Sequence, residues 1–210
     1  MSTPIRDTAT DIWVDAEVWV SLEVAPQIDT ATEELFGAEW DLVGLLSGSD
    51  GFAQSREFST TSAEAWGKGE VDGADYGFRS TGGFTALEDT NVVRYMINPG
   101  STEHVIVVPK PSHVHLAYVA TNQRGEKEIL LTRKKARVFA PDVSKTQEFA
   151  GTAFEVTHYA DSIGALFDRV YIDSADNVHT YAPIRIKGLT TPETPLDTKG
   201  IAVTPPPTGV

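Results

Sequence analysis

Apolar and polar residues alternate along much of the chain, and this period of two most restricts the possible folds. Between residues 17 and 24 every second residue is Val or Leu. Side chains of a strand point alternately to its two faces, so the pattern predicts a half-buried strand. Similar patterns predict further strands around residues 40–45, 76–84, 105–108, 116–121, 126–132, 136–140, 152–159 and 165–172. The expected fold class is therefore all-β.

Two short polar segments predict hairpin turns between neighbouring strands. Asn122-Gln123-Arg124-Gly125 joins two of the predicted strands and has the composition of a tight turn. Residues 160–164 separate the last two predicted strands and indicate a second hairpin. The segment 105–108 is β-branched throughout and ends at Pro109, as expected for a short strand.

One helix is expected at residues 89–97, flanking the sheet. Either Asp89 or Thr90 can cap its first turn, because a side-chain oxygen at that position accepts hydrogen bonds from free backbone N–H groups. Four apolar residues between 92 and 97 form one stripe, and Asn98-Pro99-Gly100 ends the helix. A further helical turn is expected at residues 30–36.

Composition limits both the domain organisation and the function. The formal net charge of −13 argues against a protein that grips nucleic acid, which needs a surplus of Lys and Arg. Cysteine is absent, so the chain has no disulfide and no thiol nucleophile. Residues 1–12 are expected to form a mobile arm, residues 13–187 one β-domain, and residues 188–210 a Pro-rich tail. We find no signal peptide or membrane span and expect synthesis in a bacterial cytoplasm.

No residue pattern predicts catalysis, and we expect a protein that is not an enzyme and needs no cofactor or metal. His113 and His115 could share a strand face and chelate a metal, but no third ligand is indicated. Gly67-Lys68-Gly69 lacks the spacing of a phosphate-binding loop. The basic run 133–137 fits either DNA contact or ion pairs with carboxylates of a neighbouring subunit, and we favour the ion pairs.

The segment from Gly44 to Val71 carries the most specific sequence signal. It contains a Gly/Ser turn, a strand-like run to Phe58, a polar Ser/Thr stretch and then Ala65-Trp66-Gly67-Lys68-Gly69. This arrangement resembles the major tail tube protein of long-tailed (siphovirus) phages that infect actinobacteria. An extra Gly-Ser lengthens the turn, and Lys68 interrupts the glycine pair of that family. The order of later elements fits the resemblance over residues 13–173.

The resemblance implies a fold, an assembly and a set of partners. The fold would be a β-sandwich or barrel with a flanking helix, a strand from Asp50 to Phe58 and a long loop from Ser59 to Asp72. Subunits would form stacked hexameric rings, giving a virion tail tube through which DNA is ejected. The tape measure protein and the tail terminator and tip proteins would be partners.

Two groups of residues are candidates for function on this basis. The candidate contacts between rings are Ser59, Thr60, Thr61, Trp66, Lys68 and Glu70. The candidate acidic lining of the bore is Glu126, Glu128, Glu155 and Asp168. Carboxylates in such a bore would repel DNA phosphates and keep passage fast.

Two other functional classes remain open from sequence. One is a different β-rich virion protein, such as a capsid decoration protein or a minor tail component. The other is a ligand-binding β-sandwich, for example a carbohydrate-binding module, which would present exposed aromatic residues such as Trp66, Tyr76 and Phe78 in a planar row.

Overall fold

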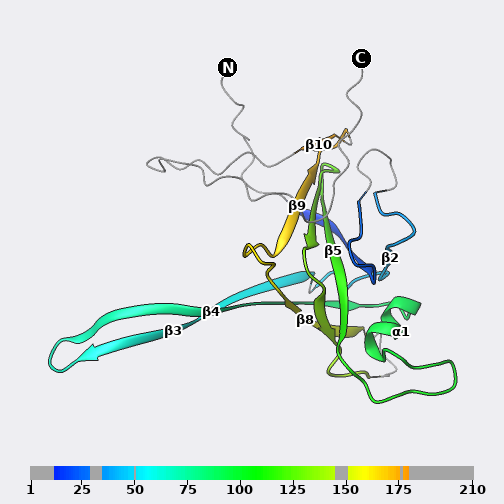
Figure 1. The fold of residues 1–210 in the computed structure, drawn as a ribbon. Helices are drawn as coiled ribbons and strands as arrows, with labels where there is room; N and C mark the ends of the chain where they lie inside the picture. The colour runs from blue at the N-terminus through cyan, green and yellow to red at the C-terminus, as the bar shows by residue number, and fades with distance from the viewer. Residues whose placement is uncertain (1–11, 29–34, 50, 145–150, 176, 180–210) are drawn as a thin grey trace, which may run out of the picture.

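The computed structural model describes residues 12–28, 35–49, 51–144, 151–175 and 177–179. Within these ranges the chain is mostly β-structure with one short helix, which confirms the expected fold class (Figure 1). The strands are β1 (Trp13–Ser21), β2 (Asp41–Leu42), β3 (Phe52–Ala65), β4 (Gly69–Ala86), β5 (Ser112–Asn122), β6 (Lys127–Thr132), β7 (Ala136–Phe139), β8 (Thr152–His158), β9 (Phe167–Ile172) and β10 (Val178–His179). The predicted terminal arms and the helical turn at 30–36 fall largely outside the described residues.

The strands form one continuous antiparallel sheet that folds back into two layers. The order β10-β9-β6-β5-β1-β2 makes the first layer, and β3-β4-β8-β7 makes the second. Strand β5 belongs to both, because Ser112–Val114 pair with β7 and residues from Ala117 onward pair with β6. The expected sandwich is thus present, but the described strands do not close into a barrel, since β2, β10 and β3 remain edges.

Two apolar clusters pack on the two faces of the first layer. The first cluster lies between the layers and joins Val18, Leu116 and Tyr118 to Phe84 and Phe154. The second covers the opposite face of the first layer, where Trp19 stacks on Phe36 and Phe36 meets Trp40 edge to face. These rings belong to the same cluster as Val119 and Ile129. Strand β1 therefore lies between two cores, and Trp19, expected on the polar face, packs against Phe36 with ring centroids 4.5 Å apart.

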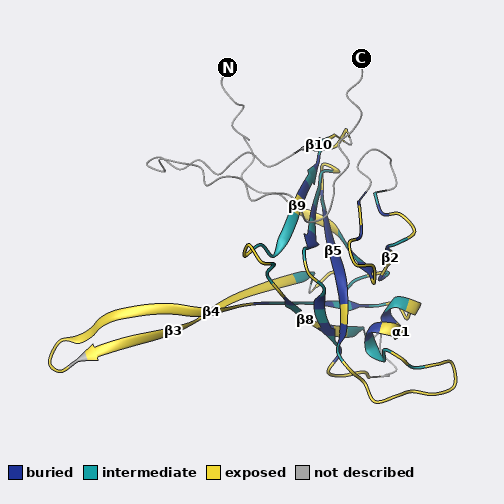
Figure 2. Cartoon of the chain, in the orientation of Figure 1, coloured by how far each residue is buried: buried dark blue, intermediate teal, exposed yellow. Residues whose placement is uncertain are grey.

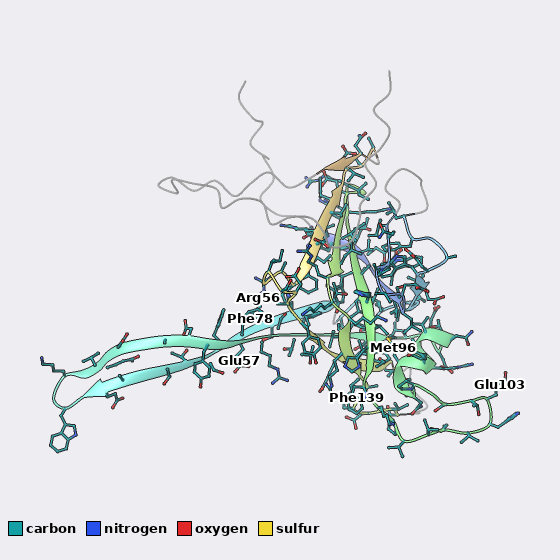
Figure 3. All side chains as sticks on the ribbon, in the orientation of Figure 1. Arg56, Glu57, Phe78, Met96, Glu103 and Phe139 are labelled. Carbon is teal, nitrogen blue, oxygen red and sulfur yellow. The ribbon has the colours of Figure 1, made fainter. Side chains whose placement is uncertain are left out.

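The helix α1 (Asn91–Ile97) confirms the prediction from its cap and stripe. Thr90 is the N-cap, and its hydroxyl accepts a hydrogen bond from the Val93 N–H. Val93 and Met96 are buried against the sheet, as Figure 3 shows for Met96. Asp89, the alternative cap, instead forms an exposed ion pair with Arg94.

Thr90→Ala is expected to lower the free energy of unfolding by about 1–2 kcal/mol. The Thr90 hydroxyl accepts from the Val93 N–H and also donates to the Val43 carbonyl at 3.0 Å, so the change removes two hydrogen bonds. Denaturant unfolding of the variant measures this loss. Thr102→Ala, at an exposed threonine, is the control, and equal losses in the two variants would contradict the capping role.

Two predicted strand features are wrong. The segment Val105–Val108 forms no strand: the Thr102 N–H donates to the Val105 carbonyl, and the Val107 N–H donates to the Ser101 hydroxyl, so the segment closes a local turn. Pro109 and Pro111, which follow, have no N–H with which to continue a ladder. The four side chains remain exposed.

The second predicted hairpin is also wrong in its pairing. Strands β8 and β9 exist, but β8 pairs with β4 and β7, whereas β9 pairs with β6 and β10. Strands β8 and β9 therefore do not pair with each other: β8 lies beside β7 and β9 lies beside β6, which are consecutive in the chain. The tight turn between β8 and β9 lies where the sheet folds. The Asp161 side chain holds this turn by accepting from the N–H groups of Ile163 and Ala165.

Candidate functional site

A long β-hairpin projects from the body of the protein. Strands β3 and β4 pair from Phe52↔Phe84 at the base to Ala65↔Gly69 at the tip. Strand β8 covers β4 only from Ser80 to Ala86, so the hairpin continues beyond Ser80 as a two-stranded ribbon. Residues 69–79 of β4 are exposed, a run of about 35 Å for an extended strand. Figure 2 shows the ribbon exposed along its length, whereas the buried residues lie in the body.

The predicted loop from Ser59 to Asp72 is in fact the outer half of this hairpin. Only residues 66–68 form the turn, and Gly67 and Gly69 take left-handed backbone angles that suit its tight reversal. The sequence lacks alternation here because the body covers neither face of the ribbon. Polar and small residues on both faces are typical of a loop, which explains the wrong prediction.

The residues proposed for contacts between rings all lie on this ribbon. Ser59, Thr60, Thr61, Trp66, Lys68 and Glu70 are exposed. Trp66 is fully exposed at the tip, next to Lys68. Thr60 donates a hydrogen bond to Asp75 across the strands at 2.7 Å. The structure thus brings these six residues onto one projecting element.

The hairpin is irregular at its midpoint. The pairing shifts between Glu57 and Ser59, where Gly77 adopts a φ of +63°. Phe58 and Phe78 meet at this point with ring centroids 5.0 Å apart, and both are partly exposed. Figure 3 places Phe78 and Glu57 on the ribbon where it leaves the body. The aromatic pair therefore stiffens the ribbon without a third strand.

A buried polar cluster anchors the base of the hairpin, and the sequence analysis missed it. The Tyr118 hydroxyl lies 3.0 Å from His158 Nε2, and His158 Nδ1 lies 3.4 Å from the Ser80 hydroxyl. Gln54 on β3 donates to the same Ser80 oxygen. Gly82 packs against His158, since a Cβ there would lie 3.0 Å from the ring and 2.8 Å from the Ala53 carbonyl. The sequence signal that could have found it is the alternation of Phe154, Val156 and His158, which places His158 on the buried face of its strand.

Burial determines the protonation of this cluster. It lowers the pKa of His158 to about 4 and raises the pKa of Tyr118 well above its usual value. A neutral imidazole has one N–H donor and one acceptor nitrogen, so His158 can bond to the Tyr118 and Ser80 hydroxyls at the same time, as donor to one and acceptor from the other. The cluster therefore links strands β3, β4, β5 and β8 through uncharged hydrogen bonds at neutral pH.

Arg133 occupies the fold of the sheet, where the sequence predicted a pairing between subunits. Its guanidinium lies 3.0 Å from Asp161 and 3.4 Å from Asp168 of the same chain, and its side chain is only 4% exposed. Partial burial acts to raise the pKa of Asp161, but the N–H groups of Ala165 and Ile163, together with Arg133, hold that pKa below its usual value. Intersubunit pairing of Arg133 is therefore not supported.

The four carboxylates proposed for a bore lie on different surfaces. Glu155 is exposed on the outer face of β8, opposite the buried Phe154 and Val156. Asp168 contacts Arg133, and Glu128 pairs with Arg169 at 2.7 Å. Glu126 lies in the turn before β6, where it accepts a hydrogen bond from Asn122. Of the four, Glu155 alone belongs to the outer face of the second layer.

An apolar groove lies beside the base of the hairpin. Trp13 and Val14 of β1, together with Leu42 and Leu45, contribute exposed apolar side chains to it. Asp15, Glu17 and Glu88 also line the groove, which has a volume of about 630 Å³. The surface thus combines an apolar floor with three carboxylates.

The described residues offer no metal centre and no helix able to cross a membrane. They contain no cluster of three His, Asp or Glu side chains that could hold a metal ion. His115 is buried with Nδ1 3.0 Å from the Thr132 carbonyl, whereas His113 is exposed. Within the same ranges, helix α1 is too short to span a bilayer.

The sequence matches no known family model and no curated protein.

Proposed function

We propose that this chain is a structural virion protein that assembles with identical copies into stacked hexameric rings of a phage tail tube. The observation that carries the proposal is the projecting hairpin, with its exposed faces and its tip formed by Trp66 and Lys68. The sequence resemblance of residues 44–71 supplies the particular assembly. In this proposal the protein has no catalytic role.

The hairpin favours assembly for a physical reason. A two-stranded ribbon is only marginally stable alone in water, and strand β3 forms an edge of the sheet along its whole length. Neighbouring molecules that cover its faces and pair with its edge would stabilise such a ribbon. Lone ribbons of this length also invite aggregation unless a specific partner covers them.

The direction of the hairpin favours a contact that repeats. Its tip lies about 35 Å from the body. If the tip of one copy binds the body of another, the two surfaces in contact are different parts of the molecule. Such head-to-tail contacts generate closed rings or open stacks rather than simple dimers. A tube of stacked rings contains both.

The charge favours a conduit for DNA. Six copies carry a formal total of 6 × −13 = −78. Acidic walls would repel phosphates, an effect that salt screens. Glu155 is the proposed bore residue best supported by its exposed position on the second layer. In this setting the tape measure, terminator and tip proteins are the proposed partners.

Negative-stain microscopy of the concentrated full-length protein tests the proposal, with striated tubes as the expected result. Closed particles would instead favour a capsid decoration protein. Monomers at every concentration would contradict the tube and favour a ligand-binding sandwich.

Trp66→Ala is expected to leave the monomer folded and to reduce tube formation at least tenfold, because an exposed indole has no role in its own core. Circular dichroism checks the fold and sedimentation of tubes measures assembly. Tyr95→Ala, at a partly exposed aromatic residue on α1, is the control. Normal tubes from the Trp66 variant would exclude the tip from the contact.

A further inference from the structure

The groove beside the hairpin base is an exposed apolar surface that needs an occupant. Its floor is formed by Trp13, Val14, Leu42 and Leu45, and we call it the acceptor groove. Scattered apolar residues are normal on a surface, but a continuous patch beside a hollow marks an interaction site. Strand β2 bounds this patch and is only two residues long, so it leaves the side chains of β1 uncovered.

The tip of the hairpin complements this groove in chemistry. Trp66 offers a large apolar ring, and Lys68 offers a positive charge two residues away. The groove offers apolar walls for the ring and the carboxylates of Asp15, Glu17 and Glu88 for the ammonium group. Its volume of about 630 Å³ leaves room for an indole together with the narrow turn that carries it.

We propose that the acceptor groove binds the hairpin tip, residues 66–68, of a second copy of this chain. This inference rests on the proposed assembly and names the surface that receives the hairpin. Trp66 acts as the apolar anchor, and Lys68 sets the orientation by approaching the three carboxylates.

The same copy cannot supply the tip. Gly51 lines the groove and lies directly before β3, so the groove adjoins the base of its own hairpin. The two strands then lead away from the body for about 35 Å before they reach Trp66 (Figure 1). The contact therefore joins two molecules, and a chain of such contacts keeps a free tip at one end and a free groove at the other.

Zero-length carbodiimide cross-linking of the full-length protein tests this contact. At concentrations where copies associate, we expect intermolecular links from Lys68 to Asp15, Glu17 or Glu88, identified by mass spectrometry of the digested dimer. Links from Lys68 only to other carboxylates would overturn the acceptor groove and leave the proposed assembly intact. A wild-type chain that never associates would overturn both.

Charge exchange provides the independent test. Lys68→Glu and Asp15→Lys each place like charges in the contact and are expected to raise the concentration needed for assembly about tenfold. Asp15 is exposed, and within the described part of the chain its carboxylate accepts only a local backbone hydrogen bond, from Ala16, so its replacement should leave the fold unchanged. Lys110→Glu, at an exposed lysine away from the groove, is the matched control and should not change this concentration.

An equimolar mixture of the two variants is expected to recover assembly. The acidic tip of the Lys68→Glu variant then meets the basic groove of the Asp15→Lys variant, and the remaining tips and grooves are unaltered. Recovery in the mixture, with impairment of each variant alone, supports the pairing. Impairment without recovery, or normal assembly of Asp15→Lys alone, would overturn it.

Discussion

Arg133→Ala is expected to lower the free energy of unfolding by about 3–5 kcal/mol. The arginine is almost fully buried and contacts Asp161 and Asp168, whose side chains are themselves only 18% and 20% exposed. Removal of the guanidinium leaves two poorly hydrated carboxylates close together, and desolvated like charges are costly. Urea unfolding followed by tryptophan fluorescence measures the loss.

Two further variants separate this effect from a general loss of charge. Arg94→Ala breaks an exposed pair with Asp89, where the two side chains are 64% and 69% exposed, and should cost far less stability than Arg133→Ala, because solvent screens the pair. Adding Asp161→Asn and Asp168→Asn to Arg133→Ala should recover part of the loss, because the stranded charges are removed. A loss for Arg133→Ala no larger than that for Arg94→Ala would contradict the buried-pair interpretation.

The His158 cluster is expected to make stability fall as the pH is lowered from about 6.5 to about 4. Burial favours the neutral imidazole in the folded state, whereas the unfolded chain binds a proton at the ordinary pKa near 6.5. Between these values the unfolded state binds more protons, so stability rises with pH. The contribution is complete above the unfolded pKa, is lost as the pH approaches the folded pKa, and amounts to about 2–3 kcal/mol.

The comparison of His158→Gln with wild type isolates this contribution. Burial also lowers the pKa of His115, but that histidine is present in both proteins, so its effect cancels in the difference. We expect His158→Gln to lose most of the slope between pH 6.5 and 4, measured by urea unfolding at several pH values. His104→Gln, at an exposed histidine, should keep the slope. Equal slopes for wild type and His158→Gln would exclude the cluster as its source.

Local signals predicted the elements that depend on local chemistry. The cap at Thr90 and the apolar stripe containing Val93 and Met96 gave the helix almost to the residue. The turn from Asn122 to Gly125 gave the hairpin of β5 and β6, because it is closed by its own hydrogen bonds. Neither feature needs information from distant parts of the chain.

Features that depend on contacts between distant residues could not be predicted from local sequence signals. Strands β8 and β9 were located, but their partners are chosen by the fold of the sheet at Arg133, which brings together groups far apart in sequence. The outer hairpin was taken for a loop because alternation records burial, and its ribbon is exposed on both faces. Of the candidate site, the sequence therefore identified the residues near the tip but neither their strand structure nor the polar cluster at the base.

The two register shifts in the hairpin, after Glu57 and after Ala63, fix the distance between its ends. A regular ribbon of small polar residues can slip, since many alignments of its strands are nearly equal in energy. Each irregularity fits only one alignment of the two strands. The number of residues between Ser80 and Trp66 therefore sets how far the tip lies from the body. In any array built through this element, that length acts as a ruler, and the axial period would be encoded in the residue count of a single hairpin.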